Sequence, residues 1–172
     1  MSKILANDGI SESGKVALEE KGFQVITEKV DQENLIETIN KEGIEVLLVR
    51  SATTARKELI DACPNLKIIG RGGVGMDNID VEYAKEKGLE VYNTPAASSS
   101  SVAELVFAHL FGMVRFLYES NRQMPLEGDE NFKSLKKAFS GGSELTGKTL
   151  GIIGFGRIGQ EVAKRAIGLG MN

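Results

Sequence analysis

Residues 148–159 read KTLGIIGFGRIG, a short apolar run that passes directly into three glycines spaced as G-x-G-x-x-G. The apolar run predicts a buried strand, and residues 160–169 predict a helix. Between them, Gly154 permits a tight turn, Gly156 lets a pyrophosphate approach the backbone, and Gly159 allows close packing of helix on strand. We therefore expect a dinucleotide site here. The alternatives are a glycine turn without a ligand and a site for another adenosine ligand.

Apolar runs also alternate with charged, helix-favouring stretches through the first ninety residues. Five runs predict strands, at residues 3–6, 23–26, 44–49, 66–69 and 89–92. Helices are expected between them, at residues 13–21, 31–42, 55–62 and 81–87, several ended by a glycine of the kind that closes a helix in a left-handed conformation. This alternation predicts a parallel sheet covered by helices and argues against a sandwich or a helical bundle.

A change of composition marks a domain boundary. Asn93-Thr94-Pro95 interrupts the alternation, because proline removes a backbone donor and restricts the residue before it, and a run of serines follows. We expect one domain over residues 1–97 and a second over residues 98–172.

The second domain is expected to open with a helix over residues 101–118. Its first four residues, Ser101 to Glu104, have the form of a capping box. Apolar residues lie on nearly every face of this helix, more than packing against one sheet requires, so the surplus predicts a subunit interface. Residues 119–144 are polar and contain glycines, and they predict a loop or arm.

Composition excludes several classes of function. The 172 residues include 21 Lys and Arg against 24 Asp and Glu, which argues against nucleic acid and anionic membranes as partners. The most apolar segment, residues 102–117, is shorter than the ~20 residues of a membrane span, and the N-terminus lacks a signal peptide, so we expect a cytoplasmic protein. A single cysteine, Cys63, allows no intramolecular disulfide, and a single histidine, His109, leaves no zinc cluster or histidine triad.

A second glycine-rich loop, residues 70–80, follows one of the expected strands. Its glycines leave backbone amides free to face an anion, and Arg71 can add positive charge. Arg50 follows the neighbouring strand, and the carboxyl ends of adjacent parallel strands lie together, so both arginines could converge on one carboxylate or phosphate. The alternative interpretation is a glycine-rich turn capped locally by its own Asp-Asn pair.

These motifs resemble the D-isomer-specific 2-hydroxyacid dehydrogenases, most closely their D-3-phosphoglycerate dehydrogenase branch. The resemblance covers nearly the whole chain and rests on residues 50–53, 63–67, 70–80, 93–95, 101–105 and 145–159. It implies an α/β protein with a flavodoxin-like parallel-sheet substrate domain, followed by the first part of a Rossmann dinucleotide-binding domain across a deep cleft. It also implies a homodimer formed by helix 101–118 and arm 119–147.

The resemblance also implies the residues of the binding sites. The substrate carboxylate or phosphate would be held by Arg50, Ser51, Arg71, Gly73, Val74 and Gly75. The cofactor, NAD, would be contacted by Val74, Gly154, Phe155, Gly156, Arg157, Ile158 and Gly159. The implied reaction is hydride transfer between NAD and 3-phosphoglycerate, which gives 3-phosphohydroxypyruvate, the entry to serine biosynthesis.

The family's catalytic arginine, glutamate and histidine are all expected beyond Asn172, as is the acidic residue that contacts the ribose and separates NAD from NADP. We therefore expect an incomplete fragment that is inactive alone. Glu104 is interpreted as a helix cap and His109 as a core or interface histidine. Two alternatives stay open: another D-2-hydroxyacid dehydrogenase, such as a glyoxylate or hydroxypyruvate reductase, and a non-catalytic NAD-sensing protein of the same fold.

Overall fold

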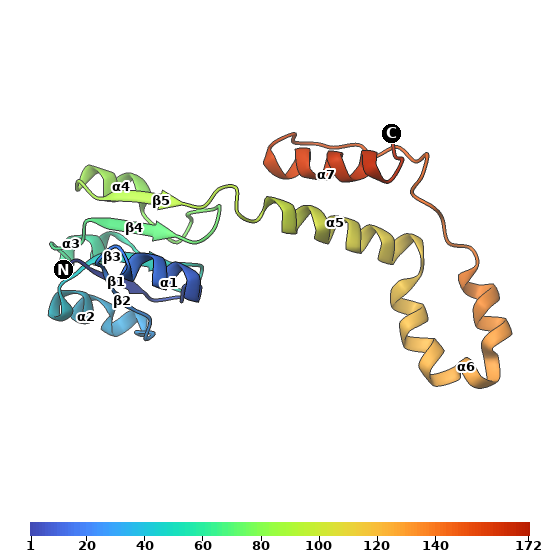
Figure 1. Ribbon diagram of the computed structural model, residues 1–172, viewed down its shortest axis with the longest axis horizontal. Coiled ribbons are helices and arrows are strands. Elements are labelled where there is room, and N and C mark those ends of the chain that lie inside the picture. The colour runs from blue at the N-terminus through green and yellow to red at the C-terminus, as the bar shows by residue number, and fades with distance from the viewer. The chain divides into compact units, whose positions relative to one another are not determined.

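The computed structural model describes residues 1–172 and divides the chain into two compact units, Met1–Ala97 and Ser98–Asn172. Each unit has a hydrophobic core of its own. Figure 1 shows the order of the elements along the chain.

The first unit is a five-stranded parallel sheet with helices between its strands (Figure 1). Its elements are β1 (Lys3–Ala6), α1 (Glu12–Glu19), β2 (Gln24–Ile26), the 3-10 turn η1 (Gln32–Asn34), α2 (Leu35–Glu42), β3 (Ile44–Val49), α3 (Lys57–Ala62), β4 (Ile68–Arg71), α4 (Val81–Glu86) and β5 (Glu90–Asn93). The strand order is β2-β1-β3-β4-β5, with every neighbouring pair parallel. The α/β parallel sheet predicted from the alternation is confirmed.

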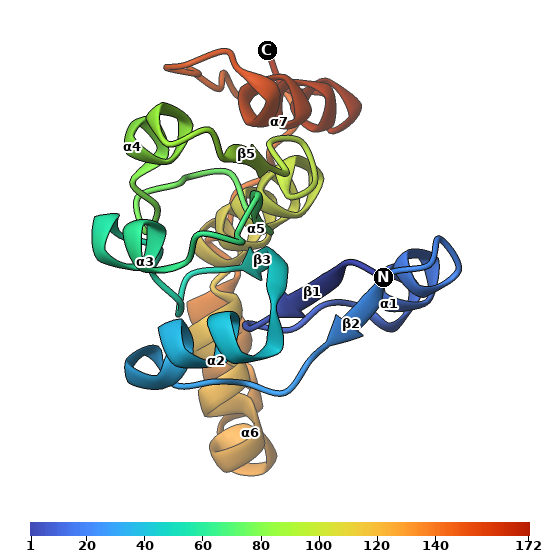
Figure 2. The same cartoon turned by 90° about the vertical axis from the view of Figure 1, so that its left-hand side faces the viewer.

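Helices lie on both faces of this sheet. Figure 2 shows α2, α3 and α4 on one side and α1 on the other. The first side is the well-packed one: Leu35 and Ile39 of α2 and Leu59 of α3 are buried in one cluster with strand residues such as Leu47. By contrast, α1 buries no residue.

The prediction that glycines close the helices is confirmed at α2. Gly43 closes α2 with φ 65°, a left-handed conformation that a residue with a Cβ rarely adopts. The chain then enters β3 directly, and the first residue of this strand, Ile44, is fully buried in the core.

The strand order places a topological switch point between β1 and β3. The chain leaves β1 toward β2 on one side and reaches β3 on the other, so the loops after these two strands separate at the sheet's carboxyl edge. In open parallel sheets, ligands bind in the crevice that such a divergence creates.

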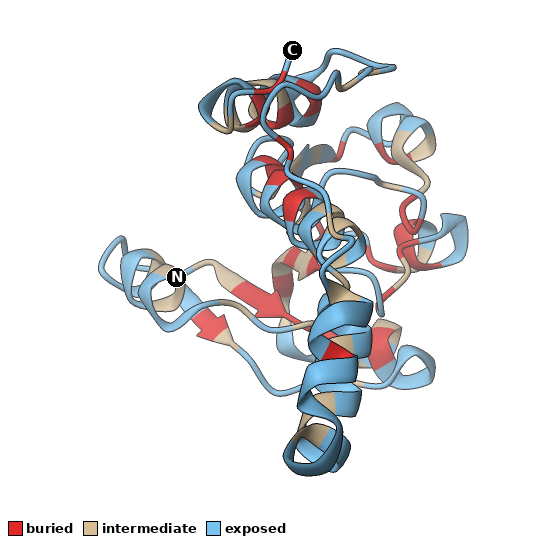
Figure 3. Ribbon diagram, turned by 90° about the vertical axis from the view of Figure 1, so that its right-hand side faces the viewer, coloured by how far each residue is buried: buried red, intermediate tan, exposed pale blue.

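The second unit contains three helices, α5 (Ser99–Val114), α6 (Leu117–Phe139) and α7 (Arg157–Gly168). Its core forms where Ala103 and Phe107 of α5 meet Val162 and Ala166 of α7. Most of α6 is exposed (Figure 3), and it buries only Leu135. No single helix has the length and apolar composition to cross a membrane, whereas α5 and α6 together, bent by 56°, satisfy that test.

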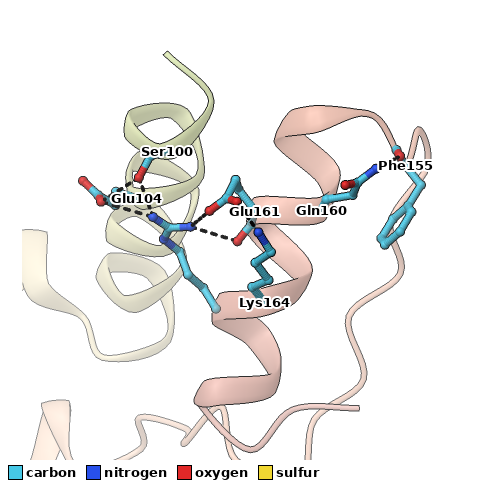
Figure 4. A network of polar contacts seen from close by, with 7 residues as sticks. Ser100, Glu104, Phe155, Gln160, Glu161 and Lys164 are labelled. Carbon is cyan, nitrogen blue, oxygen red and sulfur yellow. Dashed lines mark hydrogen bonds and ion pairs between the residues drawn. The ribbon is translucent and has the colours of Figure 1, made fainter. Parts of the chain in front are cut away.

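A polar network joins α5 to α7 (Figure 4). The Arg165 guanidinium donates to Glu161 Oε2 at 2.7 Å on its own helix, and to Ser100 Oγ at 2.6 Å and Glu104 Oε1 at 3.2 Å on α5. The predicted capping box is therefore wrong. The helix begins at Ser99, two residues before Ser101, so Glu104 is free to hold α5 against α7.

Two further expectations for this unit are wrong. The helix expected to continue to residue 118 ends at Val114, because Phe116 takes a left-handed φ of 53°. The expected loop or arm is mostly the helix α6, which tolerates Pro125 in its interior and kinks at Asn131. His109 is exposed on α5, so of its two expected places the core is excluded, and a place in a subunit interface stays a prediction.

The strand expected over residues 148–153 is also absent. Leu150 N–H donates to Asn172 O, and Asn172 N–H donates to Lys148 O, both at 2.8 Å. These two bonds have the geometry of parallel pairing but extend over too few residues to make a strand. Ile153, at the end of the segment, is fully exposed.

Candidate functional site

A cleft of about 730 Å³ opens at the carboxyl edge of the sheet in the first unit. It is lined by the loop after β1 and by the ends of β3, β4 and β5, through residues Asp8–Ser11, Leu48–Arg50, Gly70–Gly72 and Tyr92–Thr94. The cleft thus lies at the switch point and brings together Arg50 and Arg71, as the sequence predicts.

The backbone of Arg50 is held on both sides. Its N–H donates to Asp8 Oδ2 at 2.6 Å, and its carbonyl oxygen accepts from Asn78 Nδ2 at 2.8 Å and from Arg71 Nε at 3.2 Å. The Arg50 guanidinium itself is exposed and forms no ion pair within the chain. It is therefore free to bind an anion.

Arg71 lies in the same cleft but is already engaged. Its side chain is 13% exposed, donates to the Arg50 carbonyl oxygen, and lies 3.8 Å from Asp77 Oδ1. The guanidinium adds positive charge to the cleft wall, and its hydrogen bond also fixes the position of Arg50. Asp77 thus pairs with Arg71, and Asn78 is a buried donor to the Arg50 loop.

The loop after β4 is tied to β5 through its carbonyl groups. Thr94 N–H donates to Gly73 O at 3.0 Å, and Asn93 Nδ2 donates to Val74 O at 2.7 Å. The N–H groups of Val74 and Gly75 make no hydrogen bond within the chain, and Val74 is 47% exposed. These amides can bind an anion, although Gly73, Val74 and Gly75 lie outside the lining of the cleft.

A second, smaller pocket of about 420 Å³ adjoins the loop after β1 and shares Arg50 with the cleft. Ser51 lines this pocket and not the cleft. Lys29, from the segment after β2, also lines it, so a second cation lies at the same edge of the sheet. The sequence pattern did not single out Lys29.

Asp8 has an altered acidity. Burial alone would raise its pKa, but hydrogen bonds from Arg50 N–H, from the Thr53 hydroxyl and from Thr53 N–H outweigh that effect. The positive charge of Lys29 acts in the same direction, so the pKa of Asp8 lies below its usual value. Asp8 is accordingly a carboxylate at neutral pH.

This shift predicts a pH-dependent stability. Because the pKa of Asp8 is lower in the folded protein, its contribution is fully present above the unfolded value of about 4 and is lost as the pH falls through the folded value. We expect the difference in thermal midpoint between the wild-type protein and Asp8→Asn to be constant from pH 7 to 5 and to shrink below about pH 4. A difference that persists unchanged to the lowest pH at which the protein folds would contradict this assignment.

The three glycines of the turn before α7 each meet a different requirement of the backbone. Gly154 has φ 93°, which permits the tight turn. A Cβ at Gly159 would overlap the carbonyl oxygen of Gly154 and lie 3.3 Å from Ile152 Cγ2, whereas a Cβ at Gly156 would meet nothing within 4 Å. The turn is therefore closed toward the protein at Gly159 and open to a ligand at Gly156.

The helix that follows presents unpaired amides. α7 starts at Arg157, and its N-cap residue, Gly156, supplies no side-chain hydrogen bond. Phe155, Arg157 and Ile158 are exposed around the turn. Free N–H groups and the positive end of the helix dipole suit a pyrophosphate, so the residues of the turn fit a dinucleotide. In the whole chain, no group of three or more His, Cys, Asp or Glu side chains is placed to hold a metal ion.

Comparison with known proteins agrees with these features. The family model of the D-isomer specific 2-hydroxyacid dehydrogenase catalytic domain matches residues 4–164. The chain belongs to this family. The resemblance drawn from the motifs is thereby confirmed.

Two curated relatives are equally similar to this chain in sequence identity. Hydroxypyruvate reductase from Thermotoga maritima is 44% identical over 98% of the chain, which spans 53% of that protein. D-3-phosphoglycerate dehydrogenase from Methanocaldococcus jannaschii is 44% identical over 100% of the chain, which spans 31% of that protein. The chain therefore spans about half or less of the length of these relatives.

Solved dehydrogenase structures share the fold. The NAD-dependent formate dehydrogenase from Staphylococcus aureus in complex with NAD is 28% identical with a TM-score of 0.74, over 100% of this chain and 55% of that one. An acyclic imino acid reductase in complex with NADPH and D-Arg is 29% identical with a TM-score of 0.76, over 98% of this chain and 54% of that one. Structural neighbours of this chain thus bind either nicotinamide dinucleotide.

Proposed function

We propose that the whole protein is an NAD-dependent dehydrogenase that interconverts 3-phosphoglycerate and 3-phosphohydroxypyruvate, the first step of serine biosynthesis. In this proposal residues 1–97 form the substrate domain and residues 98–172 the first part of the NAD-binding domain. The observation that carries it is the unpaired guanidinium of Arg50, which lines a cleft at the switch point and shares a second pocket with Lys29. Paired cations at one edge favour a substrate with more than one negative charge.

The site residues divide the work of binding. Arg50, Ser51 and Arg71, with the free amides of Val74 and Gly75, bind the carboxylate and phosphate of the acid. The N–H of Gly73 already donates to Arg71 O at 3.0 Å, so Gly73 contributes the shape of the loop. The glycine turn and the amides of Arg157 and Ile158 bind the cofactor pyrophosphate. The bound nicotinamide supplies the acceptor of the hydride in one direction and its donor in the other.

An unphosphorylated substrate is the second candidate. Arg71 is already bound to the Arg50 carbonyl and faces Asp77, so Arg50 is the one cleft arginine without an internal partner. A single free arginine suffices for a carboxylate, as in a hydroxypyruvate or glyoxylate reductase, and the reductase relative is as similar as the phosphoglycerate dehydrogenase.

A substrate panel separates the two candidates. The full-length protein is assayed with NADH, and then with NADPH, on 3-phosphohydroxypyruvate, hydroxypyruvate and glyoxylate. Because one charge-assisted contact contributes about 1.5–3 kcal/mol, we expect kcat/KM to favour the phosphorylated acid by roughly 10- to 100-fold, with NADH preferred. Equal or higher efficiency with hydroxypyruvate would reject the phosphoglycerate assignment and retain the family.

We also propose that the protein is a cytoplasmic homodimer. Large apolar side chains are exposed on α5 and at the start of α6, namely Leu105, Val106, Phe111, Met113, Leu117 and Tyr118. Exposed apolar residues at this density are typical of a subunit interface. The mass of the full-length protein in solution tests this part of the proposal.

A further inference from the structure

The loop after β1 holds the loop after β3 through one carboxylate. Asp8 Oδ2 accepts from Arg50 N–H at 2.6 Å and from Thr53 N–H at 3.1 Å, and Asp8 Oδ1 accepts from the Thr53 hydroxyl at 2.8 Å. These three bonds cross the switch point, where the sheet itself provides no hydrogen bonds between the diverging loops. They enclose the four-residue turn that carries Arg50.

A buried amide completes this arrangement. Asn7 Nδ2 donates to Thr53 Oγ1 at 2.9 Å, so the Thr53 hydroxyl accepts from Asn7 and must donate to Asp8. The Asn7 side chain also pairs with the backbone of Val30 through both its Nδ2 and its Oδ1. Asn7 and Thr53 are each 3% exposed, so the support beneath Asp8 is rigid.

The Arg50 backbone is consequently fixed while its side chain is not. Asp8 holds its N–H, and Asn78 and Arg71 hold its carbonyl oxygen. A guanidinium on a fixed backbone loses less conformational freedom when it binds an anion than one on a mobile loop. Fixing the backbone therefore raises affinity without adding a contact to the ligand.

We propose that Asp8 is the positioning residue of the substrate site, acting through the Arg50 backbone to orient the Arg50 guanidinium toward the anion in the cleft. The proposal rests on the proposed function for the identity of that anion. Asp8 need not contact the substrate. Its loss should weaken substrate binding through Arg50 and leave the chemical step unchanged.

The chemistry of the side chain explains why a carboxylate suits this position. Asp8 accepts three hydrogen bonds at two oxygens and donates none. In Asp8→Asn the remaining oxygen can still accept from both N–H groups, but the new NH₂ group faces Thr53 Oγ1, so the Thr53 hydroxyl hydrogen loses its acceptor. We therefore expect Asp8→Asn to retain part of the function and Asp8→Ala to lose it.

A double-mutant cycle in the full-length enzyme tests this coupling. KM and kcat are measured for wild type, Asp8→Ala, Arg50→Ala and the double variant, with whichever of 3-phosphohydroxypyruvate, hydroxypyruvate and glyoxylate is reduced best. With the phosphorylated acid we expect Asp8→Ala to raise KM about tenfold with kcat within about twofold, and with an unphosphorylated acid to raise KM by no more than Arg50→Ala does. With either acid, Asp8→Ala should change KM less than about twofold once Arg50 is alanine. Asp8→Asn should raise KM about threefold.

Asp61→Ala is the matched control, because Asp61 is a hydrogen-bonded carboxylate of the same unit, paired with Tyr83 and Lys87 outside the cleft. It should lower the thermal midpoint without changing KM. An equal rise in KM with and without Arg50 would overturn the proposal for Asp8, since it would mean a general effect on the fold.

The outcomes separate this inference from the proposed function. A preference for an unphosphorylated acid rejects the phosphoglycerate assignment, but the cycle is still run with that acid and still decides the role of Asp8. A preference for 3-phosphohydroxypyruvate, together with additive effects of Asp8→Ala and Arg50→Ala on KM, would support the proposed function and reject the role of Asp8. No turnover with any of the three acids overturns both.

Discussion

Replacing Gly159 by alanine should prevent the second unit from forming its cofactor turn. A Cβ at this position overlaps the Gly154 carbonyl oxygen, which is backbone and cannot move aside as a flexible side chain would. α7 must then separate from the turn, and its contacts through Val162 and Ala166 with α5 weaken. We expect a destabilisation of about 2 kcal/mol and at least a tenfold loss of NADH affinity, measured in the full-length protein by thermal unfolding and by fluorescence titration.

Two other glycines of the same helix and turn make this prediction specific. A Cβ at Gly168, the last residue of α7, meets nothing within 4 Å, so Gly168→Ala should leave NADH affinity unchanged and raise stability slightly. Gly156→Ala also meets only open space, and its φ of −77° suits alanine. It should fold normally but bind NADH more weakly, because its Cβ occupies the approach of the pyrophosphate.

These variants remain informative if Gly159→Ala does not fold. Loss of NADH affinity in Gly156→Ala at unchanged thermal stability would then support the cofactor site by itself. Normal NADH affinity in both Gly156→Ala and Gly159→Ala would remove the glycine turn from the cofactor site.

The fold of the first unit could be predicted because its signals are local. Each apolar run is separated from the next by a helix-favouring stretch, and glycines such as Gly43 mark where helices end. The structure of α6 could not be read in the same way. Pro125 and Gly128 suggest a break, yet one missing donor does not end a helix of 23 residues, and the kink lies further on, at Asn131.

The absence of a strand at residues 148–153 and the role of Asp8 could not be predicted for a different reason. Residues 148–153 have the composition of a strand, but a strand also requires a partner, and the segment pairs only with Asn172. The role of Asp8 depends on Arg50 and Thr53, which lie 42 and 45 positions away. The sequence does contain one signal for Asp8, which is its position: Asn7 and Asp8 are a polar pair directly after the first strand of the sheet.

Replacing Arg50 by alanine should have the largest effect on substrate use. Its guanidinium is the free cation of the cleft, and a charge-assisted contact to phosphate contributes about 1.5–3 kcal/mol, so we expect kcat/KM for 3-phosphohydroxypyruvate to fall about 100-fold, mainly through KM. With glyoxylate, which has no phosphate, the fall should be less than about tenfold. Arg50→Lys should lie between, since lysine keeps the charge but not the two-pronged geometry.

Arg56→Ala is the control for loss of a nearby arginine. Arg56 precedes α3, pairs with Asp80 at 3.0 Å and does not line the cleft, so its removal should leave kcat/KM unchanged for both acids. An equal loss with both acids in Arg50→Ala would assign Arg50 to the carboxylate that the two substrates share, and would leave the phosphate to Lys29 and the loop after β4. A loss confined to the phosphorylated acid would place the phosphate at Arg50, because the carboxylate contact is then made by other groups.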